Sequence, residues 1–219
     1  LLSIGLLLPM HFLAAQTPDT GLRLITSPLP INLVTEPGKV ITTDLRIKNG
    51  GSQKETLKIN ILKFRAYEET GKPELQEIDL SDDFVKWVTF SEPVFTLAPE
   101  EWKTITATFT PPETASFGYY YAFVFSRAED GLEETNASQT TLVGGSALLV
   151  LLEVRVPNAK REVVVTEFSV DKKFYEFLPT TFSVRLKNTG NVHIAPRGNI
   201  FIDRGETHDV AILEINAEK

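Results

Sequence analysis

The chain has 219 residues, of which 42% are hydrophobic and 23% charged, a composition typical of a folded protein with a sizeable core. The formal net charge is −7, and basic clusters do not exceed "DKK" at 171–173 or "AKR" at 159–161. These features exclude nucleic-acid binding, which needs clustered Lys and Arg to displace counterions. There are no cysteines, so disulfides, thiolate metal sites and cysteine nucleophiles are excluded as well.

The N-terminus reads as an export signal. An apolar run up to Leu13 is followed by Ala14-Ala15-Gln16 and then by a polar stretch, which is the pattern of a hydrophobic region and a cleavage site. An initiator Met and a basic leading region are missing, so an uncleaved membrane anchor stays an alternative. We therefore interpret residues 1–16 as a signal peptide or N-terminal membrane segment. The protein is expected to be exported to the cell surface, the extracellular space or the periplasm, touching a membrane only through an anchor.

Residues 22–156 have the pattern of one β domain. Runs rich in Val, Ile, Thr and aromatic residues are separated by Pro, Gly and Asn. We expect strands over residues 22–34, 40–48, 56–67, 84–90, 102–110, 117–127 and 141–156, and a short helical turn over 80–86 with Ser81 as its cap. No apolar helical stripe is sustained over the ~10–12 residues that a helix prediction needs. Short strands at this spacing predict an immunoglobulin-like (Ig-like) β-sandwich.

A sequence repeat predicts a second domain of the same type. "DLRIKNGG" at 44–51 recurs as "SVRLKNTG" at 183–190, and in both copies an alternating strand ends in an Asn/Gly turn. We expect a partial second Ig-like domain over residues 161–219, with strands over 162–170, 180–187, 193–203 and 208–215. A complete sandwich needs about 90–100 residues. The predicted fold class is therefore all-β, with tandem Ig-like β-sandwiches of which the second is incomplete.

Catalytic motifs are absent from the sequence. It contains no nucleophile elbow, HExxH helix, P-loop or GxGxxG. A metal site of histidine and carboxylate ligands can be drawn on the segment that carries His193 and His208, with Asp203, Glu206 and Asp209 nearby. Polar residues on hairpin faces and tips are the simpler interpretation. We expect no enzymatic activity, no cofactor and no metal.

Two stretches carry a resemblance to a known family. They are "EPGKVITTDLRIKNGG" at 36–51 and "FTLAPEEWKTITATFTPPETASFGYYYAFVFSR" at 95–127. Together they resemble the N-terminal domain of bacterial WxL-interacting cell-surface proteins, part of a wider group of Ig-like, pilus-chaperone-like sandwiches. The resemblance covers about residues 22–156, and the partial domain lies where that family carries its second Ig-like domain. It implies that the first domain engages cell-wall peptidoglycan or a wall protein and that the second faces a host or partner molecule.

The segment at 117–127, "FGYYYAFVFSR", is apolar on both faces of the predicted strand. A tyrosine-corner arrangement would turn Tyr120 and its face inward, whereas the larger volume of the face with Tyr119, Tyr121 and Phe123 argues for the opposite register. Either register leaves a hydrophobic face over, and the predicted strand at 141–156 is also apolar on both faces. The surplus is covered by the second domain, a helical turn or a loop, or it binds a partner. Our hypothesis assigns partner binding to Tyr119, Tyr121 and Phe123.

The sequence thus predicts an exported bacterial cell-surface protein with a non-catalytic binding or scaffolding role. The expected partner is a cell-wall polymer or a surface protein. One alternative is a periplasmic assembly chaperone of the pilus type, which would offer an exposed strand edge to a subunit by β-augmentation. Another is an accessory module of a larger exported enzyme.

Overall fold

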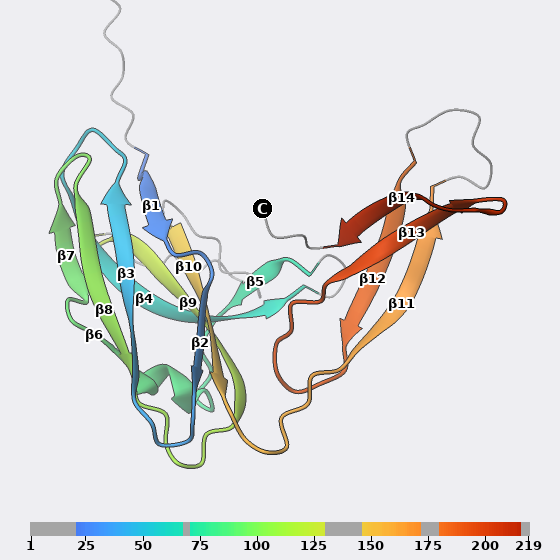
Figure 1. Ribbon diagram of the computed structural model, residues 1–219. Coiled ribbons are helices and arrows are strands. Elements are labelled where there is room, and N and C mark those ends of the chain that lie inside the picture. The colour runs from blue at the N-terminus through green and yellow to red at the C-terminus, as the bar shows by residue number, and fades with distance from the viewer. Residues whose placement is uncertain (1–20, 68–70, 130–145, 172–179, 216–219) are drawn as a thin grey trace, which may run out of the picture.

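The computed structural model describes residues 21–67, 71–129, 146–171 and 180–215, and it confirms the all-β fold class. Strands β1 to β10 form the first module and strands β11 to β14 the second (Figure 1). The predicted signal segment, residues 1–16, lies outside the described residues. Within the described ranges, no helix is long and apolar enough to span a bilayer. The domain boundaries at 22–156 and 161–219 stay predictions.

Two sheets build the first module. One has the strand order β1 (Leu24–Ser27), β3 (Ile41–Asn49), β8 (Trp102–Phe109) and β6 (Val88–Phe90). The other has the order β2 (Ile31–Thr35), β10 (Ser146–Val154), β9 (Phe117–Arg127), β4 (Glu55–Ala66) and β5 (Pro73–Gln76), and β7 (Val94–Leu97) also pairs with β4. The sandwich core lies between these sheets.

The N-terminal strand crosses between the two sheets. We expected one strand over residues 22–34, but the structure has two, separated by the segment with Pro28 and Pro30. Proline lacks the N–H that a ladder needs, so it ends pairing in one sheet. β1 then pairs antiparallel with β3, whereas β2 pairs parallel with β10.

Side-chain volume decides which face of β9 points into the core. Tyr121, Phe123 and Phe125 have no exposed surface and belong to the core cluster between the sheets. The ring of Phe109 from β8 meets Tyr121 edge-on at 5.3 Å between centroids. Burying one such aromatic side chain contributes about 1.5–3 kcal/mol, so the register that buries the larger face is strongly favoured.

Several local expectations were wrong. The helical turn is a 3-10 helix, η1 (Asp83–Trp87), whose N-cap is Asp82 rather than Ser81 and makes no side-chain capping bond. The strand expected over 84–90 therefore contains only Val88–Phe90, because the preceding residues are helical. β5 and β7 were not predicted: each has four residues, too few for a clear alternation.

The second module consists of two hairpins. β11 (Val163–Val170) pairs with β12 (Phe182–Asn188), and β13 (Gly198–Arg204) pairs with β14 (Thr207–Ile215). β13 starts later than the expected residue 193, since residues 193–197 are irregular. Large side chains are exposed, with Val165 at 62% and Phe168 at 56%. Among the described residues, these four strands enclose no core of their own.

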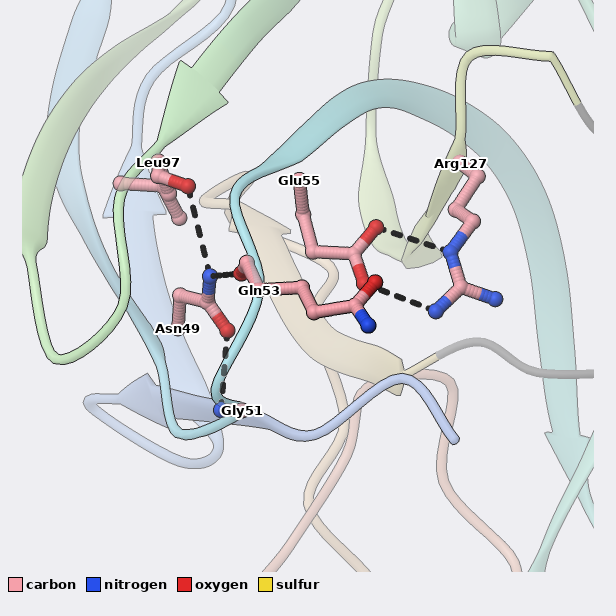
Figure 2. A network of polar contacts seen from close by, with 6 residues as sticks. All are labelled: Asn49, Gly51, Gln53, Glu55, Leu97 and Arg127. Carbon is pink, nitrogen blue, oxygen red and sulfur yellow. Dashed lines mark hydrogen bonds and ion pairs between the residues drawn. The ribbon is translucent and has the colours of Figure 1, made fainter. Parts of the chain in front are cut away.

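An asparagine turn ends β3. The Oδ1 of Asn49 accepts a hydrogen bond from the N–H of Gly51 at 2.9 Å, and its Nδ2 donates to the carbonyl of Gln53 at 2.6 Å (Figure 2). The N–H of Gly50 donates to the carbonyl of Arg23, immediately before β1, at 2.8 Å. The buried carboxamide therefore fixes the chain reversal after β3.

The same turn ends β12. The Oδ1 of Asn188 accepts from the N–H of Gly190 at 2.9 Å, and its Nδ2 donates to the carbonyl of Val192 at 2.8 Å. The N–H of Thr189 donates to the carbonyl of Glu162, immediately before β11, at 2.9 Å. These contacts repeat those of the first turn position by position. β11 and β12 are therefore the counterparts of β1 and β3.

Candidate protein-binding site

Strand β10 has an edge that is only half covered. On one side it pairs with β9 along its whole length. On the other side β2 reaches only Val150–Val154, so no described strand pairs with Ser146–Leu149 there. We call this stretch the open edge of β10.

The backbone directions at the open edge follow from the pairing with β2. The N–H of Arg155 donates to the carbonyl of Thr35, the last residue of β2, at 2.8 Å. Successive residues of a strand point their N–H and C=O groups to alternate sides. Ala147 and Leu149 therefore direct theirs at the open edge, where unpaired groups can take another strand.

The face of the six-stranded sheet that points away from the core is apolar beside this edge. Leu149 and Ala147 of β10 lie opposite Ala122 and Val124 of β9, and Leu62 of β4 lies opposite Ala122. Ala122, Val124 and Leu62 are buried, while Leu149 and Ala147 are half-buried. The surplus apolar face expected from the sequence is thus one continuous cluster, which we call the outer face, and of these residues only Leu149 and Ala147, at the edge, keep part of their surface exposed.

The three residues assigned to partner binding lie on the core face of β9. Tyr121 and Phe123 are fully buried. Tyr119 is half-buried: its ring meets Trp87 at 4.7 Å between centroids, and its hydroxyl accepts from the N–H of Ser116 at 3.1 Å. Their partner-binding role stays a prediction. The apolar side chains next to the open edge of β10 lie on the opposite face of the sheet. We therefore take the outer face as the candidate site.

A buried carboxylate lies at the far end of β10. Glu153 is only 3% exposed and forms an ion pair with Arg161 of the linker between the modules. The Nε of Arg155 lies 3.8 Å from the same carboxylate. A buried charge without a partner is costly, so the Arg161 guanidinium is what makes this position tolerable for Glu153.

The second module contacts the first beside this carboxylate. The ring of His193 meets the ring of Tyr120 nearly at right angles, 6.1 Å between centroids. Burial lowers the pKa of His193, and the nearby Glu153 opposes that shift. Burial also raises the pKa of the Tyr120 hydroxyl. The candidate site is therefore bounded at this end by a mixed aromatic and charged contact between modules.

The linker is held by the loop after β12. The N–H of Lys160 donates to Oδ1 of Asn191 at 2.7 Å, and the N–H of Asn191 donates back to the Lys160 carbonyl at 3.1 Å. A Cβ at Gly190 would overlap the same Lys160 carbonyl, so glycine is required there. These contacts tie the second module to the linker residues that also reach Glu153.

The histidine and carboxylate cluster drawn from the sequence is not assembled as one site. The Nδ1 of His208 lies 3.0 Å from Oδ2 of Asp203, whose Oδ1 accepts from the N–H of Asp209 at 2.9 Å. His193 instead packs against Tyr120. In the described part of the chain, no three His, Asp or Glu residues are grouped as metal ligands would be. The open edge of β10 instead offers unpaired backbone groups beside apolar side chains. These are the features by which proteins bind an extended polypeptide.

Sequence reasoning missed the open edge. It depends on β2 being short, and β2 was expected to be part of one longer strand. The signal was present in the prolines at positions 28 and 30, since proline is confined to strand ends and edges.

No protein-family model and no curated protein match this chain. Similar solved structures include the class 5 fimbrial chaperone CfaA, with 15% identity over 88% of this chain and 79% of that one and a TM-score of 0.44. The chaperone–tip adhesion subunit complex CsuC–CsuE of Acinetobacter baumannii gives 10% identity, 90% and 88% coverage and a TM-score of 0.40. A family 123 glycoside hydrolase from Clostridium perfringens gives 11% identity, 58% and 23% coverage and a TM-score of 0.38.

The first two of these structures are pilus chaperones, which belong to the wider group of Ig-like folds named from the sequence. The narrower resemblance to WxL-interacting proteins finds no support among them. At such identities and TM-scores, none of these likenesses carries an argument about function.

Proposed function

We propose that this chain is an exported, non-catalytic protein-binding protein that holds an extended segment of a partner protein, as an assembly chaperone does. The observation that carries the proposal is the open edge of β10, where Ser146–Leu149 lack a second strand among the described residues. Unpaired strand edges are templates for strand addition. The partner is therefore expected to be a protein, such as a surface protein or subunit.

Backbone pairing alone would bind such a segment weakly. A strand added over four residues forms a few hydrogen bonds, each worth about 0.5–1.5 kcal/mol net. Leu149 and Ala147 lie next to the edge with half-buried apolar side chains. A partner with apolar residues at alternate positions would cover them, at roughly 25 cal/mol per Å² of apolar surface buried. An alternating apolar strand is therefore the chemistry that this edge fits.

A cell-wall polymer is the less suitable ligand for this edge. An unpaired strand is complementary to an extended peptide backbone, which the glycan strands of such a polymer lack. Export is part of the same proposal and depends on the signal-like pattern of residues 1–16. An experiment can distinguish the two predicted partners, a wall polymer and a surface protein.

The test uses the chain with Ala147→Pro, which removes an N–H aimed at the open edge and leaves the N–H groups that face β9. The probe is a synthetic peptide of alternating Val and Thr. We expect the peptide to slow amide exchange at Ala147 and Leu149 in the unmodified chain and not to bind the variant. The matched control is Val34→Lys, an exposed position on β2 beside the covered half of β10, which should retain binding.

A parallel assay uses insoluble peptidoglycan. If peptidoglycan retains the unmodified chain and the Ala147→Pro variant equally, while the peptide binds neither, the proposal is wrong and the wall-binding role predicted from the sequence is favoured. Circular dichroism of each variant establishes that it is folded.

A further inference from the structure

The loop after β12 carries the contact of the second module with the first. Val192 in this loop is only 1% exposed, whereas the strands of the same module leave Val165 and Phe168 more than half exposed. The next residue, His193, is half-buried, and its ring lies 6.1 Å from the ring of Tyr120 between centroids. The Tyr120 hydroxyl is also hydrogen-bonded to the backbone of His193. We call the contact of His193 with Tyr120 the module contact.

A glycine on β9 makes room for the Tyr120 ring. A Cβ at Gly118 would overlap the Tyr120 hydroxyl, so the ring can lie there only because position 118 has no side chain. Gly118 in turn lies opposite Glu153 of β10. The module contact is therefore formed directly beside the buried carboxylate.

The charged and titratable side chains that face His193 come from three segments. They are Tyr120 of β9, Glu153 of β10 and Arg161 of the linker. The Glu153 carboxylate already forms an ion pair with Arg161, and the Nε of Arg155 lies 3.8 Å from it. Its negative charge is therefore largely compensated and attracts a further cation only weakly.

This environment accommodates the imidazole of His193 in its neutral form. Within the described ranges, the Nδ1 of His193 is buried and has no hydrogen-bond partner. A protonated imidazole carries an N–H on both nitrogens, so Nδ1 would become a buried donor without an acceptor, close to the Arg161 guanidinium. Burial accordingly lowers the pKa of His193, and Arg161 lowers it further, although Glu153 opposes the shift.

We propose that the module contact is a pH-sensitive switch, closed while the His193 imidazole is neutral and released when the imidazole is protonated. A group with a lowered pKa in the closed state stabilises that state fully above its free value, here 6.5, and the stability is lost as pH falls through the closed-state value. For a single proton, the ratio of released to closed molecules rises by at most about tenfold per pH unit.

Release would have two consequences for the molecule. It would uncover Tyr120 on β9, and it would let the second module turn about the linker that contains Arg161. The switch lies at the junction of the modules and does not involve Ser146–Leu149. It is therefore independent of the proposed function, and either can be wrong without the other.

The experiment measures the distance between two spin labels, one on each module, by pulsed electron paramagnetic resonance at pH 8 and pH 5. The chain has no cysteines, so Thr104→Cys on β8 and Ser183→Cys on β12 introduce the two labelling sites. Both positions are exposed. We expect one narrow distance distribution at pH 8 and a second, broader distribution that grows as pH falls below 6.5. Circular dichroism at each pH establishes that the strands are intact.

Two histidine variants of the labelled chain form a matched pair. His193→Phe keeps an aromatic ring against Tyr120 but cannot take up a proton, so the narrow distribution should persist at pH 5. His208→Gln removes an exposed histidine that pairs with Asp203 in the other hairpin, and it should leave the pH response unchanged.

A third variant provides the reference for the released state. Gly118→Ala displaces the Tyr120 ring and should give the broad distribution at both pH values. Tyr120→Ala serves the same purpose if circular dichroism shows that Gly118→Ala does not fold.

Four results would overturn the proposed switch. A broad distribution already at pH 8 would mean that the module contact does not hold the modules together. An unchanged narrow distribution at pH 5 would mean that the contact does not respond to protons. An equal response in His193→Phe would assign the titration to a carboxylate such as Glu153. A distribution that becomes narrower in acid would mean that Glu153 holds the protonated imidazole and tightens the contact.

Discussion

The hydroxyl of Tyr121 donates a hydrogen bond to the backbone carbonyl of Phe84 at 2.9 Å. The two rings also meet nearly edge-on, with 5.0 Å between their centroids. The ring of Tyr121 is buried between the sheets, and burial raises the pKa of its hydroxyl. This contact satisfies a polar group at the end of the core and joins β9 to the helix η1.

Tyr121→Phe should destabilise the first module. The substitution keeps the ring but leaves the Phe84 carbonyl without this donor, which typically costs about 0.5–1.5 kcal/mol. Urea denaturation followed by tryptophan fluorescence measures the change. Tyr119→Phe is the control, because the Tyr119 hydroxyl only accepts a bond from a partly buried N–H, and a smaller loss is expected. Equal stability of Tyr121→Phe and the unmodified chain would show that the bond contributes nothing.

Asn49→Ala should cost more stability than Asn188→Ala. Asn49 is fully buried, and its Nδ2 also reaches the Leu97 carbonyl at 3.3 Å, so its removal leaves buried groups unpaired at about 1–3 kcal/mol. Asn188 makes the same local bonds in an exposed turn, where water replaces them, and less than about 1 kcal/mol is expected. Thermal unfolding of both variants gives the order. The reverse order would contradict the argument that the burial of Asn49 sets the larger cost.

The Glu55–Arg127 pair should make the first module acid-sensitive. The carboxylate of Glu55 receives two bonds from the guanidinium, at 2.8 and 2.7 Å (Figure 2). Chiefly through the bond from Arg127, the pKa of Glu55 is lowered from 4.5. A lowered folded-state pKa gives stability that is fully present above pH 4.5 and is lost as pH falls through the folded-state value.

The measurement compares the unmodified chain with Glu55→Gln at several pH values. At pH 7 the variant should be less stable by about 1 kcal/mol, since the pair is partly exposed to solvent. The difference should shrink as pH falls below 4.5. A difference that is constant from pH 7 to pH 3 would contradict a role for the charge of Glu55.

Arg161→Ala should leave Glu153 as a buried charge with only the more distant Arg155 beside it. Removing one partner of a fully buried pair costs about 3–5 kcal/mol, but the Arg161 side chain is 49% exposed, so about 1–3 kcal/mol is expected. Combining it with Glu153→Gln should recover part of the loss, because the unpaired charge is then gone. Chemical denaturation of the single and double variants tests this, and an additive loss would argue against the pairing.

Runs of strand-forming residues and the turn residues between them were enough to predict the all-β fold and most strands. The choice between the faces of β9 was open because both are apolar, and it follows the bulk of Tyr121 and Phe123. The matching Lys-Asn turns identified a repeat whose hydrogen bonds the structure reproduces at Asn49 and Asn188. Local patterns of this kind reflect contacts within a few residues, which a sequence displays directly.

The candidate site was harder to predict, because it depends on pairing between distant segments. Nothing near Ser146 in the sequence shows that β2 stops short of it. The burial of Glu153 likewise depends on Arg161 and on a second module reached through a linker. The larger aromatic residues, to which partner binding was assigned, lie on the core face because bulk favours burial, and the smaller residues of β9 lie on the outer face.

The segment from Leu24 to Thr35 protects both sheets, β1 along β3 and β2 along part of β10. A single proteolytic cut or deletion there would uncover an edge of each sheet at the same time. Uncovered edges pair readily with those of other molecules and lead to aggregation. The solubility of the first module therefore depends on this stretch of chain, which contributes a strand to each of its two sheets.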